Sequence, residues 1–147
     1  MELLSSIAIV ILNYNHYELT INAIENINSF TNDIHIVVVD NNSPNESWAK
    51  LNEYCNKHEN KNLSLIRTTE NKGYACGNNF GIQYIRENLD VEFVAIMNPD
   101  VQIRSIDMLY KMMKVLNENK NVGAITAQTI FNNKVYYPND SCWKFSN

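Results

Sequence analysis

The sequence predicts an α/β fold in which a mostly parallel sheet is covered by helices on both faces. Two observations predict it. Short runs of β-branched aliphatic residues alternate with longer amphipathic stretches, and these runs are apolar on both faces, as buried parallel strands are. Polar residues gather directly after several of the runs, where the ligand sites of open parallel sheets lie.

The first half of the chain begins with a strand, a helix and a second strand. The aliphatic run 7–12 predicts the first strand. Residues 19–30 have apolar side chains at helical spacing, which predicts a helix with its core face at Leu19, Ala23, Ile27 and Phe30. Residues 34–39 predict the second strand, which ends at Asp40.

The next helix has a start signal of its own. Ser43 is placed to cap it, Pro44 suits the first helical position, and Glu46 completes a capping box. Its predicted inward face consists of Trp48, Leu51, Tyr54, Cys55 and His58.

The remaining pattern continues the alternation. Strands are predicted over 63–66, 93–97 and 122–130, and helices over the later part of 73–88 and over 105–119. We therefore expect one α/β domain over residues 1–131. Residues 132–147 lack clear periodicity, which predicts an irregular extension or a β-ribbon.

Composition excludes several classes of protein. The 147 residues carry 12 Lys plus Arg and 16 Asp plus Glu, so the formal net charge is −4, the opposite of what a nucleic-acid binder requires. Three cysteines are too few for a disulfide framework. The longest aliphatic run is far shorter than the roughly 20 residues of a membrane span, and no basic segment precedes it. We expect a cytoplasmic protein without direct membrane insertion.

Four polar loops follow predicted strands or precede a predicted helix, at 13–15, 40–43, 70–79 and 98–100. Asp40 ends a strand, where its carboxylate either binds a ribose or base or braces the following turn. Pro99 stiffens the turn that carries Asp100, and a fixed carboxylate suits Mg²⁺ or Mn²⁺. An ordinary Asn-Pro-Asp turn is the alternative.

The stretch 71–81 combines glycines with one cation. Gly77 and Gly81 would form a bare stripe on a helix, open to a ligand or to a packed neighbour, and we assign Gly81 to packing. Lys72 is the candidate cation for a bound diphosphate. The first strand lacks the Gly-x-Gly-x-x-Gly signature of dinucleotide-binding domains, and no P-loop signature is present.

Four of these segments in this order resemble glycosyltransferase family 2, whose members have the Rossmann-like GT-A fold. The segments are 9–15, 38–43, 71–82 and 97–100, and the resemblance runs over 6–131 and is strongest to the rhamnosyltransferase-like branch. The family transfers a sugar from a nucleoside-diphosphate donor to an acceptor with inversion at the anomeric carbon.

The resemblance implies roles for individual residues. Leu12 and Tyr14 match the loop that holds the nucleobase and ribose, and Asp40 matches the aspartate that binds the base. Lys72 and Gly73 fall near the diphosphate, and Asp100 matches the last aspartate of the metal-binding DXD-type motif, whose first carboxylate is replaced here by Asn98. The complete expected donor site is Leu12, Asn13, Tyr14, Asp40, Asn42, Lys72, Gly73, Asn78, Asn98 and Asp100, with Mn²⁺ or Mg²⁺ held by Asp100.

The family also implies what the donor and acceptor are. We expect a dTDP- or UDP-linked sugar and a cell-surface polysaccharide or lipid-linked acceptor, with the enzyme working at the inner face of the membrane. The family's acceptor-binding half and general base would lie beyond Asn147, and Asp140 is a weak substitute. We therefore expect a truncated chain that binds donor but transfers sugar poorly, and whose open sheet edge promotes self-association. The alternatives are a non-catalytic nucleotide-sugar-binding module and a flavodoxin-like interaction domain.

Overall fold

The computed structural model describes residues 2–58, 60–127, 129–131 and 134–136. The chain divides into two compact units, Met1–Ile106 and Asp107–Asn147, and each is described by itself. Asp140, considered from the sequence as a weak substitute for the general base, lies outside the described residues.

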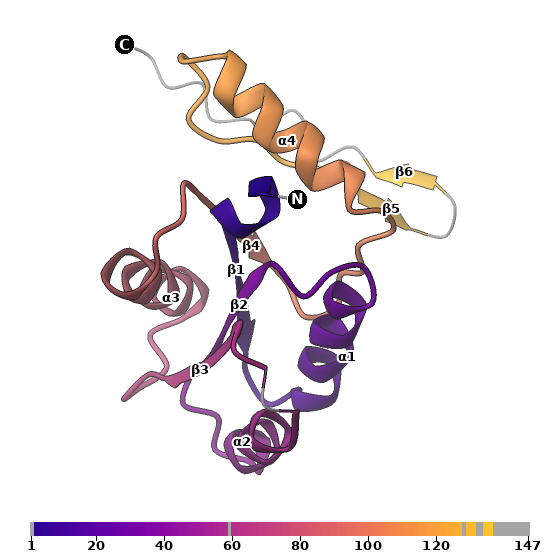
Figure 1. The fold of residues 1–147 in the computed structure, drawn as a ribbon. Helices are drawn as coiled ribbons and strands as arrows, with labels where there is room; N and C mark the ends of the chain where they lie inside the picture. The colour runs from indigo at the N-terminus through magenta and orange to yellow at the C-terminus, as the bar shows by residue number, and fades with distance from the viewer. Residues whose placement is uncertain (1, 59, 128, 132–133, 137–147) are drawn as a thin grey trace. The chain divides into compact units, whose positions relative to one another are not determined.

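The first unit is built on a parallel four-stranded sheet (Figure 1). A short 3₁₀ helix, η1 (Glu2–Ser6), leads into β1 (Ile7–Asn13), which pairs with β2 (His35–Asp40) on one side and β4 (Phe93–Met97) on the other. β3 (Leu63–Arg67) pairs with β2, so the strand order is β3-β2-β1-β4. The central strands β1 and β2 are almost entirely buried, which explains why they are apolar on both faces.

Helices cover both faces of this sheet, as the sequence predicts. α1 (Tyr17–Asn28) and α2 (Ser47–His58) pack against each other, and Figure 1 shows α3 (Tyr74–Asn88) on the opposite side from α1. Under α3 lies a buried cluster of alternate strand residues with one helical residue: Ala8, Val10, Val37, Val39 and Ile85. The predicted α/β fold with a parallel sheet between helices is therefore confirmed.

The predicted start of α2 is wrong. The helix begins at Ser47, and the Asn45 side chain accepts the Ser47 backbone N–H at 3.0 Å. Ser43 is buried and donates its hydroxyl to the Asp40 carboxylate at 2.6 Å, so it is not the helix cap. Its oxygen accepts from the Asn15 backbone N–H at 3.0 Å and from Asn13 Nδ2 at 3.3 Å, so its acceptor capacity is used within the loops and not on a helix N–H.

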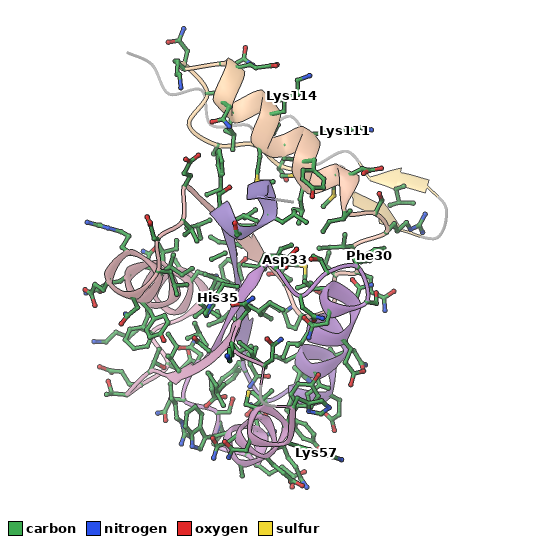
Figure 2. All side chains as sticks on the ribbon, in the orientation of Figure 1. Phe30, Asp33, His35, Lys57, Lys111 and Lys114 are labelled. Carbon is green, nitrogen blue, oxygen red and sulfur yellow. The ribbon has the colours of Figure 1, made fainter. Side chains whose placement is uncertain are left out.

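Parts of the predicted helical core faces are also exposed. Ala23 and Ile27 of α1 are buried, whereas Leu19 and Phe30 are each 41% exposed (Figure 2 labels Phe30). On α2, His58 is exposed and stacks on Tyr54 with ring centroids 4.1 Å apart. Leu19 lies in the first turn of α1, and Phe30 lies beyond Asn28, its last residue, so the buried part of the predicted face is limited to the middle and end of the helix.

The second unit contains α4 (Asp107–Glu118) and an antiparallel ribbon of β5 (Thr129–Phe131) and β6 (Lys134–Tyr136). The strand predicted over 122–130 is wrong for 122–127, which have no regular structure. A strand needs a neighbour for its backbone hydrogen bonds, and in the described part of this unit the pairing is confined to β5 and β6. Among the described residues, none of the helices is long and apolar enough to cross a membrane.

Candidate functional site

A cleft of about 540 Å³ lies at the carboxyl ends of β1 and β4, beside the start of α3. Its lining comes from the end of β1, from four loops and from the first turns of α1 and α3, and consists of Leu12, Tyr14, His16, Leu19, Asn41, Asn71, Gly73, Tyr74, Asn98, Pro99 and Asp100. The structure thus brings together the loops that the sequence singled out, at the edge of the sheet where ligands bind in parallel α/β folds.

The predicted site residues fall into two groups. Leu12, Tyr14, Gly73, Asn98 and Asp100 line the cleft. The other five are not part of its lining: Asn13, Asp40, Asn42, Lys72 and Asn78.

Asp40 is the centre of a buried polar cluster behind the cleft, formed with Asn13, Ser43 and Arg67 and named here the Asp40 cluster. Its Oδ1 accepts hydrogen bonds from Asn13 Nδ2 at 2.8 Å and Ser43 Oγ at 2.6 Å. Its Oδ2 accepts from the Ser43 backbone N–H at 3.2 Å and forms an ion pair with Arg67 Nε at 3.1 Å. The Asp40 side chain is fully buried, so what the structure shows is a brace for the loop after β2.

The Asp40 cluster extends to the neighbouring elements. Asn13 Oδ1 accepts from Thr20 Oγ1 at 2.9 Å, which ties the end of β1 to α1. Arg67 Nη2 donates to the Ser43 carbonyl at 2.8 Å, and the guanidinium lies 5.5 Å from the Trp48 ring centroid. The ends of β1, β2 and β3 are therefore joined under the cleft. Direct contacts of Asn13 and Asp40 with a nucleotide-sugar donor stay predictions.

Two asparagines that the sequence analysis did not assign hold the turn before α3. Asn71 Oδ1 accepts from the Gly73 backbone N–H at 2.8 Å and from Asn41 Nδ2 at 2.9 Å. Asn41 Oδ1 accepts in turn from Thr68 Oγ1 at 3.1 Å. Gly73 has φ +90°, a conformation that favours glycine, and these bonds fix it there. Asn41 lies next to Asp40 in the segment 38–43, and Asn71 lies next to Lys72 in the segment 71–82. This proximity to predicted site residues is the signal that could have identified them.

One hydrogen bond bridges the mouth of the cleft. Tyr74, the first residue of α3, donates its phenol hydroxyl to Asn98 Oδ1 at 2.9 Å. Asn98 begins a turn in which the Val101 N–H donates to the Asn98 carbonyl at 3.1 Å, with Pro99 in second position. The predicted stiff turn after β4 is thereby confirmed.

Asp100 lies exposed in this turn and presents a carboxylate to the cleft. Oxygen donors of this kind suit Mn²⁺ or Mg²⁺, which take their remaining ligands from water and phosphate. The described residues contain no group of three or more His, Cys, Asp or Glu side chains that could hold a metal by themselves. The donor set therefore fits a divalent cation that arrives with a diphosphate, and not a metal caged by protein.

Three predicted residues have other surroundings. Lys72 forms an exposed ion pair with Glu70 at 2.7 Å, and the hydrogen bond and charge of Glu70 raise the pKa of its ammonium group. Asn42 has φ +54° in the loop after β2. Asn78 is buried on α3 and donates to the Tyr74 carbonyl at 3.0 Å. Their contacts with a donor stay predictions.

His16 and Leu19 line the cleft although the sequence analysis did not assign them to it. His16 precedes α1 as its N-cap residue, and Leu19 is in the first turn of the helix. Leu19 follows the helical spacing of the core residues, so the sequence pattern could not separate it from them.

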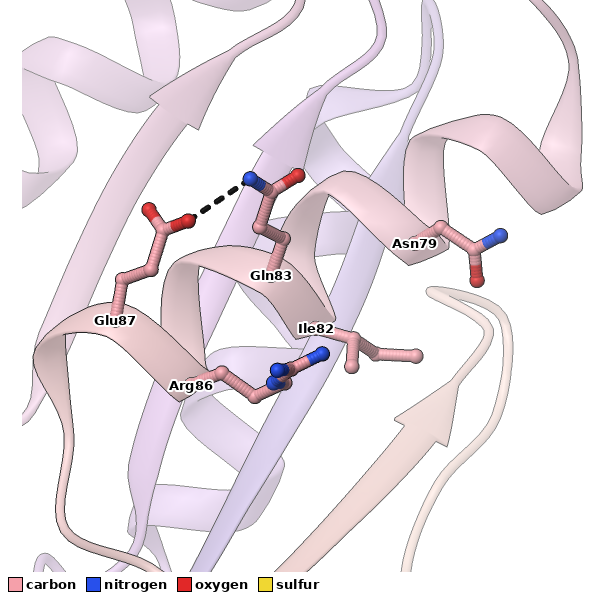
Figure 3. A pocket seen from close by; sticks show the side chains of 5 residues that line it. All are labelled: Asn79, Ile82, Gln83, Arg86 and Glu87. Carbon is pink, nitrogen blue, oxygen red and sulfur yellow. Dashed lines mark hydrogen bonds between the residues drawn. The ribbon is translucent and has the colours of Figure 1, made fainter.

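A second hollow, of about 390 Å³, runs along α3 and is lined by Asn79, Ile82, Gln83, Arg86 and Glu87 (Figure 3). Gln83 Nε2 donates to Glu87 Oε1 at 2.8 Å, one helical turn away. All five lining residues lie on α3, and Asn79 is the one among them that belongs to a predicted polar loop, whereas the first cleft brings residues of all four loops together. We therefore place the functional site in the first cleft.

Comparison with known proteins identifies the family of the chain. Residues 8–144 match the model of the family described as Glycosyl transferase family 2. The chain is 30% identical over 128 residues to the low-salt glycan biosynthesis hexosyltransferase Agl10 of Haloferax volcanii. That alignment covers 87% of this chain and 38% of the relative. A Haemophilus influenzae protein is 28% identical over 133 residues, which are 89% of this chain and 68% of that protein.

Solved structures share the fold. The mannosyltransferase PcManGT from Pyrobaculum calidifontis, in complex with GDP-Man and Mn²⁺, superposes with a TM-score of 0.62 at 21% identity. The superposition covers 76% of this chain and 32% of that protein. Staphylococcus aureus TarS 1–349 in complex with UDP gives a TM-score of 0.58 at 19% identity, covering 77% and 32% of the two chains. The predicted GT-A class of α/β fold is thereby confirmed.

The family match extends over most of the chain, from the second residue of β1 to beyond β6, and includes every loop of the cleft. The chain nevertheless spans only 38% of the length of Agl10. On this evidence the chain belongs to glycosyl transferase family 2.

Proposed function

We propose that this chain binds a dTDP- or UDP-linked sugar in the cleft and takes part in transferring that sugar, with inversion, to a saccharide acceptor. One observation carries the proposal. The Asp100 carboxylate lies exposed in a proline-stiffened turn at the end of β4, in the same cleft as the start of the 15-residue helix α3.

The two ends of the cleft suit the two ends of such a donor. Leu12 and Tyr14, at the end of β1, offer apolar and aromatic surface to a nucleobase. The start of α3 carries unpaired backbone N–H groups and the positive end of the helix dipole, which favour a phosphate. Gly73 carries no side chain, so a diphosphate can approach this helix end closely.

A divalent cation fits the charge balance. The chain has a net charge of −4, so an unscreened nucleoside diphosphate would be repelled by the protein as a whole. Asp100 would hold the cation, as the family resemblance implies, and Asn98 lies two residues away on the same turn. When bound, the cation would neutralise the charge that develops on the departing diphosphate.

The transfer itself forms a bond between an acceptor oxygen and the anomeric carbon. The bond from that carbon to the diphosphate oxygen breaks, and its electron pair leaves with the nucleoside diphosphate. The acceptor hydroxyl loses its proton to a general base. Asp100 is the one carboxylate among the described residues that line the cleft, and it is assigned to the cation, so we place the base outside this lining.

The same observation favours a second candidate function. A cleft with one carboxylate can bind a nucleotide sugar without catalysing its transfer, so a non-catalytic nucleotide-sugar-binding module is the alternative. Measured turnover of donor with a saccharide acceptor would distinguish the two.

The acceptor is proposed from the family and its relatives. A glycan biosynthesis hexosyltransferase among the relatives supports transfer of a hexose during glycan assembly. The family resemblance adds rhamnose as a candidate sugar and a cell-surface polysaccharide or lipid-linked glycan as the acceptor. Such an acceptor would place the reaction at the cytoplasmic face of a membrane.

Thermal unfolding tests the donor site. UDP, dTDP, GDP and FMN are each added with Mn²⁺ or with EDTA to the wild type, to Asp100→Ala and to the control Asp90→Ala, whose carboxylate lies exposed outside the cleft. A ligand at one hundred times its Kd adds about 2.7 kcal/mol to the free energy of unfolding. We expect UDP or dTDP to raise Tm by several degrees with Mn²⁺, in the wild type and the control but not in Asp100→Ala.

Other outcomes contradict the proposal in different ways. A shift with FMN alone would show that the protein binds a flavin nucleotide and not a nucleotide-sugar donor, and the absence of any shift would exclude a formed donor site. A full shift in Asp100→Ala would remove Asp100 from the cation site while leaving nucleotide binding in place.

A further inference from the structure

The hydrogen bond between Tyr74 and Asn98 joins two loops that are far apart in the sequence. The phenol oxygen and Asn98 Oδ1 are 2.9 Å apart, both residues line the cleft, and 24 positions separate them. Tyr74 is 57% exposed, so burial of its ring does not explain its position. An exposed tyrosine at the mouth of a cleft points instead to a role in the site.

The backbone beneath Tyr74 is held firmly. Gly73 is fixed at φ +90° by Asn71, and Asn71 is bonded to the buried side chain of Asn41. Asn41 also reaches the Gly73 carbonyl at 3.4 Å. The backbone turn that precedes Tyr74 is therefore preorganised, and it places the Tyr74 hydroxyl within hydrogen-bonding distance of Asn98.

The bond also determines which atoms Asn98 presents to the cleft. Oδ1 can only accept, and it accepts from the phenol hydroxyl. Nδ2 carries two N–H donors, for which the described residues provide no hydrogen-bonding partner. With Oδ1 fixed toward α3, these donors remain available for a ligand in the cleft.

We propose that Tyr74 is a positioning residue for the donor: it orients the Asn98 carboxamide so that Nδ2 donates to an oxygen of the donor's diphosphate–sugar part. This inference rests on the proposed function. The recognised chemistry is a hydrogen-bond acceptor oxygen, supplied either by the β-phosphate or by a sugar hydroxyl. Asn98 lies two residues from Asp100, which places the contact at this end of the donor and away from the base.

Binding measured by calorimetry in the presence of Mn²⁺ tests the inference on the full chain. The ligands are UMP, UDP and UDP-glucose, or dTMP, dTDP and dTDP-glucose if the wild type prefers thymidine nucleotides. The variants are Tyr74→Phe, Asn98→Ala and the double variant. Tyr84→Phe is the matched control, because its hydroxyl is bonded to Ser64 at 3.2 Å, away from the cleft.

We expect Tyr74→Phe and Asn98→Ala each to weaken the binding of the diphosphate or the nucleotide sugar by about threefold to tenfold, the value of one hydrogen bond. The Kd of the monophosphate should change less than twofold, which separates positioning from a general loss of structure. The double variant should bind no more weakly than Asn98→Ala, because Tyr74 acts through Asn98. Weakening that begins with UDP identifies a phosphate contact, and weakening confined to UDP-glucose identifies a sugar hydroxyl.

Several outcomes would overturn the inference. Unchanged or tighter binding in Tyr74→Phe would do so, as would equal weakening of the monophosphate or additive effects in the double variant. In each case the wild type still binds nucleotide, and the proposed function survives. A wild type that binds none of these nucleotides would overturn both the proposed function and this inference.

Discussion

At the scale of the residue, the Asp40 cluster shows how a charge can be buried at the end of a parallel strand. An isolated carboxylate in the interior would be very unfavourable. Here both oxygens are used: Oδ1 accepts from two side chains, and Oδ2 accepts from a backbone amide and pairs with Arg67. The position of the loop after β2 therefore depends on one side chain.

Replacing Asp40 with asparagine should lower the stability of the fold. In the place of Oδ2, the amide nitrogen introduced by the substitution would face the Ser43 backbone N–H and Arg67 Nε, which can only donate. In the place of Oδ1 it would face Asn13 Nδ2, and in either orientation Arg67 would lose its counter-ion. Removing one member of a mostly buried pair is strongly destabilising, and we expect a loss of about 3 kcal/mol in the free energy of unfolding. Urea denaturation measures it, with Asp90→Asn as the exposed control.

Equal stability of Asp40→Asn and Asp90→Asn would contradict this assignment. It would show that Asp40 is not needed as an anchor and would favour the predicted direct contact with a nucleobase. Donor affinity measured on both variants would then decide between the two roles.

The sequence predicts the place of a site residue well where the local backbone restricts its side chain to one position. Asp100 and Asn98 follow a strand and flank a proline, so their place at the cleft could be predicted from the sequence. Ser43 has cap spacing in the sequence, yet its hydroxyl bonds to Asp40. Choosing between these partners requires knowing that Asp40 is buried, which follows from three-dimensional packing.

At the scale of the element, two glycines on one helix have different neighbours. A Cβ on Gly81 would lie 2.7 Å from Val10 Cγ1 and 2.9 Å from Val39 Cγ2, so this glycine lets α3 pack closely on β1 and β2. The prediction that Gly81 serves packing is confirmed. A Cβ on Gly77 would lie 2.5 Å from Leu12 Cδ1 and 3.3 Å from Asn41 Cγ, both of which are residues of the cleft lining.

Alanine at these two positions should therefore have different consequences. Gly81→Ala should lower the free energy of unfolding by about 1–3 kcal/mol, because the cost of overpacking two central strands exceeds the gain in helix propensity. Gly77→Ala should mainly weaken nucleotide binding, because it displaces the Leu12 side chain at the cleft. Denaturation and calorimetry are measured on both variants.

Gly123→Ala is the matched control, since a Cβ at this position meets nothing within 4 Å. If Gly77→Ala and Gly81→Ala changed stability and affinity in the same ratio, the separation between a packing glycine and a cleft glycine would be wrong.

The same distinction explains how far the elements could be predicted. β1 and β2 were predictable because they are buried on both faces and their sequences are accordingly apolar throughout. The strand predicted over 122–130 forms no regular structure in its first part, 122–127, although apolar residues predominate there. Strand formation requires a partner as well as a sequence pattern, and sequence patterns do not report partners.

At the scale of the whole molecule, β4 is an edge strand of the four-stranded sheet that the described residues form. Val94 and Ile96 pair with Ala8 and Val10, so they lie on the face of the sheet that α3 covers. They remain 40% and 48% exposed. An edge strand with exposed apolar side chains favours pairing with another strand.

A second copy of the chain fits this edge by symmetry. Two β4 strands related by a two-fold axis at Ala95 would run antiparallel, and Val94 of each copy would lie opposite Ile96 of the other, on the same face. Such cross-strand aliphatic pairs stabilise a sheet.

We therefore predict that the chain dimerises through β4, with light scattering after size-exclusion chromatography showing a mass that rises with concentration. Ile96→Lys should give a monomer, because a charged edge residue disfavours strand pairing. Val122→Lys, which alters an exposed apolar side chain outside the sheet, should still dimerise. A wild type that stays monomeric, or an Ile96→Lys variant that dimerises as the wild type does, would show that β4 is not the site of association.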